Sequence, residues 1–196
     1  MAIRVTQVLD YLTEPELLNW YLKNGKAACK KISEAALRVG TIVDRLIQDD
    51  IRDGGYLLPG EDEPVANCMN AWEKFKAAHP QYLSLITGFQ EELTDGEVVG
   101  HPDIILADQI DDVKTSRAIQ PRYWTQTSQY ARMAKKSKVG VIRLDKETGQ
   151  FEYKVFGQDL IDYENKVFDA YLMAYKHNTT IREIVRKQLE EEVLGI

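Results

Sequence analysis

Hydrophobic residues recur every three or four positions through the first eighty residues, which is the spacing of one face of an α-helix. The pattern predicts helices over residues 5–12, 13–24, 33–50 and 64–79. Thr13-Glu14-Pro15-Glu16 is typical of a helix start with proline in the first turn, and Asn24-Gly25 is typical of a helix end. We therefore expect residues 1–80 to be mainly helical.

The pattern changes after residue 80, where shorter apolar runs alternate with turn sequences such as Thr94-Asp95-Gly96 and Glu147-Thr148-Gly149. The runs predict strands over residues 83–93, 97–106, 110–115, 139–144 and 151–156. Helices are expected over residues 121–134, 158–176 and 179–193. This order predicts an α/β (α+β) fold in which a mixed central β-sheet is flanked by helices.

The length of 196 residues suits one domain over residues 1–196. We expect it to consist of a helical N-terminal region over residues 1–80, a sheet with one helix over 81–157, and C-terminal helices over 158–196. A composition of 44% hydrophobic and 29% charged residues is typical of globular proteins, and no segment has the apolar length that crosses a bilayer. The N-terminus lacks the pattern of a secretory signal, so we expect a cytoplasmic protein without a membrane partner.

Cysteine content and charge narrow the possible chemistry. Cys29 and Cys68 are too few for a zinc or iron–sulfur site with four thiolate ligands. The net charge of −6 at pH 7 argues against nonspecific coating of nucleic acid. Residues 115–138 nevertheless contain no acidic residue, and their basic residues are Arg117, Arg122, Arg132, Lys135, Lys136 and Lys138. A polyanion could meet this segment as a locally basic face, and a solvated basic helix is the alternative.

Two neighbouring predicted strands each carry an aspartate, and the second strand also carries a lysine. Asp103 follows Pro102 on the first strand. Asp112 and Lys114 lie two positions apart on the second, so their side chains share one face. Carboxylate oxygens suit Mg²⁺, which also retains waters that a phosphate oxygen can replace. An isolated Asp-x-Lys occurs by chance on many strand surfaces, but its pairing with Pro102-Asp103 favours a metal-dependent site that cleaves phosphodiester bonds.

Pro102-Asp103 followed by Asp112-Val113-Lys114 resembles the signature of the PD-(D/E)xK nuclease superfamily. Gln126 and Tyr130 lie one helical turn apart and match the Gln-x-x-x-Tyr element of its RecB-type exonuclease branch, which includes phage and archaeal relatives. The resemblance covers about residues 5–156. It implies a restriction-endonuclease-like core that cleaves DNA with Mg²⁺ or Mn²⁺ and, without four cysteines, carries no iron–sulfur cluster.

The resemblance also implies a ligand set for the cation. Gly40 and Asp44 resemble the upstream Gly-x-x-x-His element of the branch, with aspartate in place of the metal-binding histidine. Asp44, Asp103, Asp112 and the backbone carbonyl of Val113 would then hold the cation. The alternative is that Asp44 only caps a helix or pairs with a nearby base.

On the same resemblance, Lys114 helps to activate the attacking water, and Gln126 and Tyr130 hold the DNA. The basic segment adds Arg117 and Arg122 as expected contacts, and Tyr123 and Trp124 beside them could stack on bases. His101 and Glu91 are further candidates. The alternative for His101 is a loop histidine with a structural partner, and for Glu91 it is a solvated acidic edge, which we favour.

The expected function is a DNA nuclease, an exonuclease that acts on single- or double-stranded ends in recombination, repair or phage DNA processing. A structure-specific or sequence-specific endonuclease is one alternative, and a noncatalytic DNA-binding module that retains the fold is another. The amphipathic segment 184–193 offers a surface for a homo-oligomer.

Overall fold

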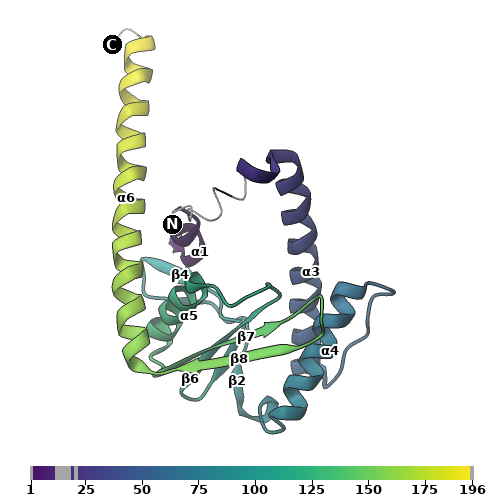
Figure 1. Cartoon of the computed structure of the whole chain (residues 1–196). Helices are drawn as coiled ribbons and strands as arrows, with labels where there is room; N and C mark the ends of the chain where they lie inside the picture. The colour runs from purple at the N-terminus through teal and green to yellow at the C-terminus, as the bar shows by residue number, and fades with distance from the viewer. Residues whose placement is uncertain (1, 12–18, 20–21, 195–196) are drawn as a thin grey trace.

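The computed structural model describes residues 2–11, 19 and 22–194 of the chain (Figure 1). Its elements, in chain order, are β1 (Ile3–Arg4), α1 (Val5–Tyr11), α3 (Lys26–Asp53), α4 (Glu63–Ala78), a 3₁₀ turn (Leu83–Leu85), β2 (Ile86–Gly88), β3 (Leu93–Thr94), β4 (Val98–Gly100), β5 (Ile104–Leu106), β6 (Gln109–Lys114), α5 (Pro121–Ala134), β7 (Lys138–Leu144), β8 (Phe151–Phe156) and α6 (Gln158–Leu194). Most of the helix expected over residues 13–24 lies outside the described residues.

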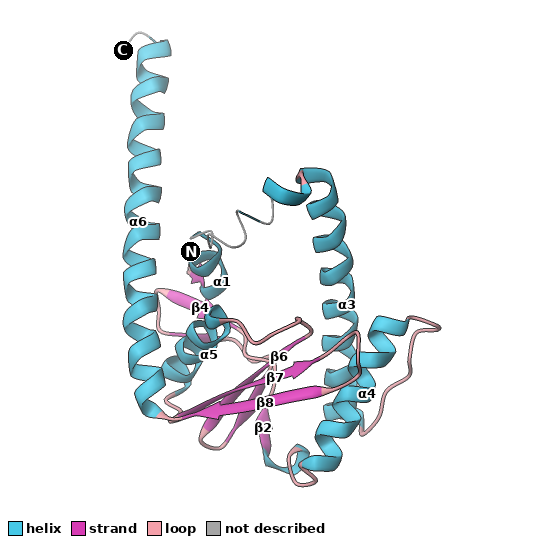
Figure 2. Ribbon diagram, viewed as in Figure 1, coloured by secondary structure: helices cyan, strands magenta, loops and turns pink. Residues whose placement is uncertain are grey.

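The central sheet has five strands in the order β2-β5-β6-β7-β8, and the small second sheet has the order β1-β4-β3 (Figure 2). In the central sheet β6 and β7 are parallel and are joined through α5, whereas the other neighbours are antiparallel. A parallel pair needs such a crossover, because a tight turn only joins antiparallel strands. The predicted α+β fold with a mixed central sheet is therefore confirmed.

Helices cover both faces of this sheet, and each face has its own hydrophobic core. One core joins α3 and α4 to β5 and β7, with Trp72 and Phe75 fully buried at its centre. The other joins α1, α5 and α6 to β5, β6 and β7, with Ile110 and Phe168 fully buried. A strand that is buried on both faces carries a continuous apolar run, as β5 does.

The strand predicted over residues 97–106 is wrong in one respect, because it is two strands in two different sheets. β4 pairs with β3 and β1, and β5 pairs with β2 and β6. The break falls at residues 101–103, where Pro102 has no backbone N–H for a ladder. The chain changes sheets at this break, so Asp103 lies directly before the first residue of β5.

The strand predicted over residues 83–93 is also wrong, because its residues form the 3₁₀ turn, β2, a loop and the start of β3. The loop contains Gln90, whose φ of 52° lies in the left-handed region. An extended strand cannot pass through such a conformation. The short strand β1 had no sequence signal, since it consists of two residues that pair with β4.

Two helices are longer than predicted. α3 begins at Lys26 instead of residue 33, because residues 26–31 are good helix formers even though they lack an apolar stripe. The two predicted C-terminal helices are one helix, α6. Thr179 and Thr180 at the expected break donate their hydroxyl groups to carbonyls four residues earlier, a bond that helices accommodate.

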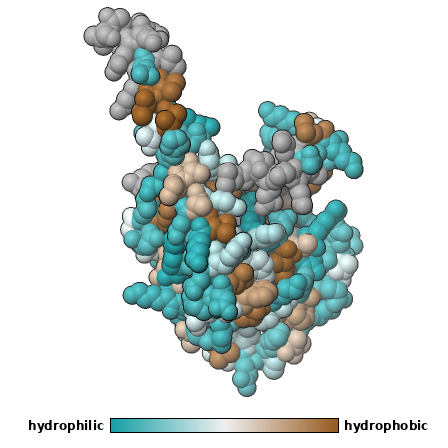
Figure 3. Space-filling view, turned by 60° about the vertical axis from the view of Figure 1, so that its left-hand side comes forward, coloured by the Kyte–Doolittle hydropathy of each residue, from teal (hydrophilic) through white to brown (hydrophobic). Residues whose placement is uncertain are grey.

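The distal half of α6 extends beyond the sheet and its covering helices (Figures 1 and 3). Ile181, Ile184 and Val185 on this half are 45%, 48% and 47% exposed, which leaves an apolar surface in solvent. Within the described ranges, no helix combines the length and apolarity that crossing a membrane requires.

Candidate metal-dependent active site

Asp112 and Lys114 form an ion pair on β6. The Lys114 ammonium lies 2.6 Å from Asp112 Oδ2, and the Lys114 and Asp112 side chains are 22% and 1% exposed. Both side chains lie on the same face because they are two positions apart on a strand. Burial raises the pKa of Asp112, and the nearby Asp103 carboxylate raises it further, while Lys114 opposes both effects.

Asp103 joins this pair through the strand register. β5 and β6 pair Ile104 with Asp111 in antiparallel order, so continuing the register places Asp103 opposite Asp112 on the same face. Asp103 Oδ2 accepts a hydrogen bond of 2.8 Å from the backbone N–H of Val113. The three residues that the signature predicts are thus brought together by the ends of two neighbouring strands.

Asp44 approaches Asp103 from helix α3. A cavity of about 230 Å³ separates α3 from the end of β6 and is lined by Gly40, Val43, Asp44, Asp103, Val113, Lys114 and Thr115. A methyl group on Gly40 would lie 3.6 Å from Thr115 Oγ1, so glycine keeps this side of the cavity open. Burial and the charge of Asp103 raise the pKa of Asp44, because both disfavour a second negative charge in the cavity.

Gln90 also lies in this site, and the sequence pattern did not single it out. Its side-chain nitrogen donates hydrogen bonds to Asp44 Oδ1 at 3.2 Å and to Asp103 Oδ1 at 3.0 Å. The amide therefore bridges the two carboxylates of the cavity. No local pattern predicts a left-handed glutamine, and the contact joins segments 46 residues apart, so sequence reasoning had no signal for it.

Lys114 is the cationic centre of the site. Burial lowers its pKa, but the charges of Asp112 and Asp103 outweigh burial, so the net shift is upward and the ammonium persists at neutral pH. The ammonium also lies 5.2 Å from the centre of the Tyr123 ring, within the range of a cation–π contact. Lys114 can therefore supply positive charge and hydrogen bonds to an anionic substrate.

Tyr130 and Gln126 lie beside this centre on α5. Gln126 Nε2 donates a 3.0 Å hydrogen bond to the Tyr130 hydroxyl oxygen. Tyr130 is 3% exposed, and burial together with the charge of Asp112 raises its pKa to about 12. The hydroxyl therefore stays protonated and can serve as a hydrogen-bond donor.

The chemistry of Asp44, Asp103 and Asp112 fits a hard divalent cation. These side chains offer only oxygen atoms, which are the preferred ligands of Mg²⁺ and Mn²⁺. Asp112 Oδ2 is buried and accepts no well-angled hydrogen bond, although the Lys114 ammonium lies close to it. Among the described residues, no group of three Asp, Glu, His or Cys side chains is close enough to hold an ion as it stands. A cation at this site would therefore need the carboxylates to move together or a further ligand to join them.

Two of the predicted DNA-binding arginines are paired with acids. Arg117 is 84% exposed and pairs with Glu147 at 3.0 Å. Arg122 pairs with Asp10 at 2.6 Å. The segment 115–138 lacks acids in sequence, but acids from distant positions lie next to its arginines and reduce the positive charge that this surface presents.

The remaining candidates lie in different surroundings. The Trp124 ring packs edge-on against Phe156 at 4.9 Å, next to the core beneath α5. His101 Nε2 lies 3.7 Å from Glu92 at the surface. The Glu91 carboxylate turns back over Gly88, where an added methyl group would meet it at 2.2 Å.

Asp111, next to Asp112 on β6, lies in a separate network on the opposite face of the sheet. The hydroxyl groups of Tyr82 and Tyr153 donate to Asp111 Oδ2, and Gln109 donates to Oδ1. The carboxylate is fully buried and has three donors, so its hydrogen bonds are satisfied within the core and it does not line the cavity beside Asp103.

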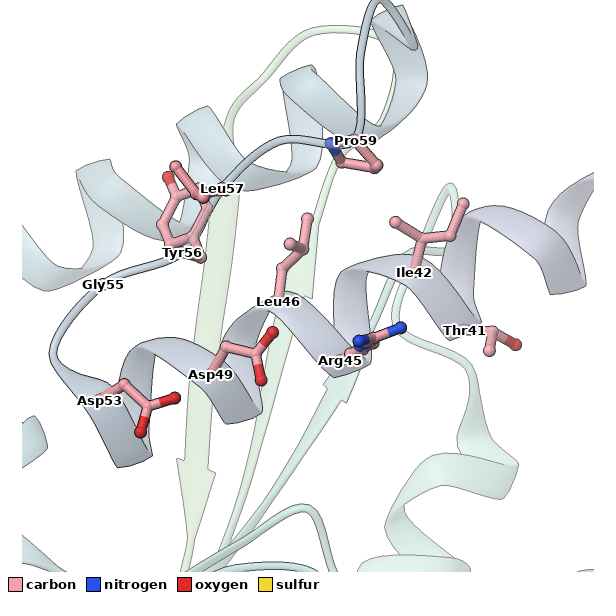
Figure 4. A pocket seen from close by; sticks show the side chains of 10 residues that line it. All are labelled: Thr41, Ile42, Arg45, Leu46, Asp49, Asp53, Gly55, Tyr56, Leu57 and Pro59. Atoms are coloured by element: carbon pink, nitrogen blue, oxygen red, sulfur yellow. The ribbon is translucent and has the colours of Figure 1, made fainter.

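The other side of α3 faces a larger cavity of about 870 Å³, formed with the loop that follows the helix (Figure 4). Arg45 and Thr41 lie along it, with Tyr56 on the loop side. Its two acids, Asp49 and Asp53, both contact Arg52. This cavity has no lysine in its lining, and both of its carboxylates are paired with Arg52, unlike those of the site on the opposite face.

Comparison with known proteins gives distant structural similarities. No family model and no curated protein matches the sequence. An alkaline exonuclease (LHK-Exo) from Laribacter hongkongensis aligns at 11% identity and a TM-score of 0.48, over 96% of this chain and 94% of that one. A phage-related exonuclease from Haemophilus somnus aligns at 12% identity and a TM-score of 0.42, over 93% and 96%. Similarities this distant assign neither an activity nor a substrate to the chain.

Proposed function

We propose that this protein is a metal-dependent DNA nuclease, specifically an exonuclease, with its active site at the carboxyl end of β6. One observation carries the proposal: Asp103 lies between the buried Asp112–Lys114 pair and the Asp44 cavity. A phosphodiester that enters this cavity meets carboxylates and an ammonium on a single surface.

The carboxylates would hold Mg²⁺ or Mn²⁺. Asp44 and Asp103 line the cavity, Asp112 lies beside them, and the carbonyl of Val113 is the proposed backbone ligand. When bound, the cation supplies positive charge at the phosphate and acidifies the attacking water. The Val113 N–H holds Asp103 at the cavity, so the strand end itself orients this carboxylate.

Lys114 would stabilise the negative charge that develops on the phosphate. Its raised pKa keeps it protonated, so it acts as a charge and hydrogen-bond donor and orients the attacking water. Asp112 and the Tyr123 ring fix the ammonium from two sides. Preorganised charge of this kind accelerates reactions because it needs no rearrangement in the transition state.

DNA would lie along α5 and the segment before it. Tyr130 and Gln126 can donate hydrogen bonds beside Lys114, and the exposed Arg117 can reach a phosphate once it leaves Glu147. The same DNA would also contact three further proposed residues, Arg122, Tyr123 and Trp124.

Lys114→Met tests the proposal, because it removes the charge and keeps most of the aliphatic side chain. We expect Mn²⁺-dependent cleavage of end-labelled linear DNA to fall by about 10²–10³-fold. Lys138→Met is the matched control, since Lys138 pairs with Asp108 at the opposite end of the parallel strands. Circular dichroism verifies that both variants fold. Undiminished cleavage by Lys114→Met would refute the assignment.

The exonuclease assignment has a separate test. Linear DNA should be degraded from its ends, and covalently closed circles should remain intact, with Mn²⁺ present. Cleavage of the circles would favour an endonuclease instead. DNA retention without any metal-dependent product would favour a noncatalytic binding module.

A further inference from the structure

Gln90 occupies the position between two carboxylates where a cation would be expected. Its side-chain nitrogen lies 3.2 Å from Asp44 Oδ1 and 3.0 Å from Asp103 Oδ1. The other oxygens of these carboxylates accept bonds from Gln48 Nε2 at 2.9 Å and from the Val113 N–H at 2.8 Å. The partly positive NH₂ group is therefore the contact that joins the two acids across the cavity.

The backbone of Gln90 is fixed to the same place. Its N–H donates a 3.0 Å hydrogen bond to the carbonyl of Pro102, directly before Asp103. Its φ of 52° belongs to the left-handed region, which side chains other than glycine and asparagine rarely adopt. Such conformations persist only where surrounding contacts hold them, and they gather at ligand sites.

The chemistry of the amide allows a second role. Turning the amide by half a rotation about its last side-chain bond exchanges the NH₂ group for the carbonyl oxygen. This oxygen is a hard, neutral ligand of the kind that divalent cations accept together with carboxylates. The hydrogen bonds to the two acids are about 1 Å longer than the ~2.1 Å of a Mg²⁺–oxygen bond, so a cation would draw the three groups inward.

The neutral oxygen of Gln90 would also supply a third ligand beside Asp44 and Asp103. Among the described residues, no three acidic, histidine or cysteine side chains are gathered closely enough to hold an ion. Asp44 and Asp103 with the Gln90 oxygen would form a compact set on one side of the cavity. Asp112 could then remain paired with Lys114.

We propose that Gln90 is a cation-binding residue of this site. Without the cation its amide nitrogen bridges Asp44 and Asp103, and with the cation its amide oxygen completes the ligand set. The proposal rests on the proposed function, because it concerns the same metal site. A purely structural bridge would instead compete with the cation for the two carboxylates, so removing the amide would then tighten cation binding.

The experiment measures Mn²⁺ binding to the full chain by isothermal titration calorimetry, independently of cleavage. Gln90→Gly removes the amide, and glycine adopts the left-handed backbone readily, so the loop is preserved. Gln90→Glu offers a charged oxygen in place of the neutral one. Gln81→Glu is the matched charge control, because Gln81 is exposed. Melting temperatures in EDTA report the state without the cation.

We expect Gln90→Gly to weaken Mn²⁺ binding by about 10-fold or more and Gln90→Glu to strengthen it by a similar factor. In EDTA, Gln90→Glu should melt about 2–4 °C lower, because a third carboxylate then replaces the amide donor between Asp44 and Asp103. Gln81→Glu should match the wild type in both measurements. If Gln90→Gly binds Mn²⁺ as tightly as the wild-type chain, or more tightly, the assignment of Gln90 is overturned and the proposed metal site is not. Absence of Mn²⁺ binding to the wild-type chain would overturn the metal site of the proposed function itself.

Discussion

Tyr130 holds its position in the site because a facing residue has no side chain. The Tyr130 ring is 3% exposed and packs over Gly100 on β4. A methyl group on Gly100 would lie 2.2 Å from one ring carbon, much closer than a real contact allows. The glycine directly before the break between β4 and β5 therefore determines where this hydroxyl lies relative to Lys114.

Gly100→Ala should displace the Tyr130 ring and lower the free energy of unfolding by about 1–3 kcal/mol, as overpacking of a core does. Urea denaturation measures this change, and DNA cleavage should fall with it because Tyr130 moves. Gly55→Ala is the control, since an added methyl group there meets no atom within 4 Å. Equal stability of Gly100→Ala and Gly55→Ala would show that the ring can move aside freely.

Side chains that share a face through strand register could be predicted, and side chains that meet across loops could not. Alternation placed Asp112 and Lys114 together, and a hairpin register places Asp103 opposite Asp112. Gln90 reaches the site only because its backbone is left-handed and its loop crosses the break before Asp103. Sequence periodicity carries no information about such a crossing.

The turn between β7 and β8 depends on one carboxylate. Asp145 Oδ1 accepts the backbone N–H groups of Glu147 at 2.9 Å and Thr148 at 3.2 Å, and Oδ2 accepts a bond from Arg143. The N–H of Glu147 contributes most to lowering the Asp145 pKa to about 2. The turn thus binds the ionised form of the carboxylate more tightly than the protonated form.

Asp145→Ala should reduce the free energy of unfolding by about 1–2 kcal/mol at pH 7. The folded-state pKa is lowered, so this contribution is fully present above the unfolded value of about 4 and is lost as the pH falls toward 2. Urea denaturation at pH 7 and near pH 2 should therefore show a difference that disappears in acid. Asp145→Asn keeps the acceptor and should recover part of the loss. A difference independent of pH would contradict the role of the charge.

Elements with strong local periodicity were predicted within a few residues, and elements decided by tertiary contacts were not. β6, α5, β7 and β8 agree with the sequence pattern. The predicted division of α6 is wrong because the polar residues at 177–180 still form helix, and the hydroxyl group of Thr179 bonds within it. The break within residues 97–106 depends on which sheet each half pairs with, and this pairing is decided by tertiary contacts that local sequence does not reveal.

Arginine and lysine side chains across the molecule pair with acidic residues that are distant from them in sequence. Arg122 and Asp10 are 112 residues apart, and Arg132 pairs with Asp169. The parallel strands β6 and β7 separate two further pairs: Arg117–Glu147 follows their carboxyl ends, and Lys138–Asp108 lies at their amino ends. The proposed active site is at the carboxyl end, so only the first of these pairs should matter for DNA.

Glu147→Gln should release the exposed Arg117 and tighten DNA binding by about two- to fivefold at low salt, the range of one surface ion pair. The slope of the logarithm of affinity against the logarithm of salt concentration should steepen by about 0.9, because one more phosphate is neutralised. Fluorescence anisotropy of a labelled oligonucleotide in EDTA measures both without cleavage. Asp108→Asn makes the same change in net charge at the amino ends of the strands, and it should leave binding unchanged. If both variants bind more tightly to the same extent, net charge alone acts and the DNA does not lie at the carboxyl end of β6.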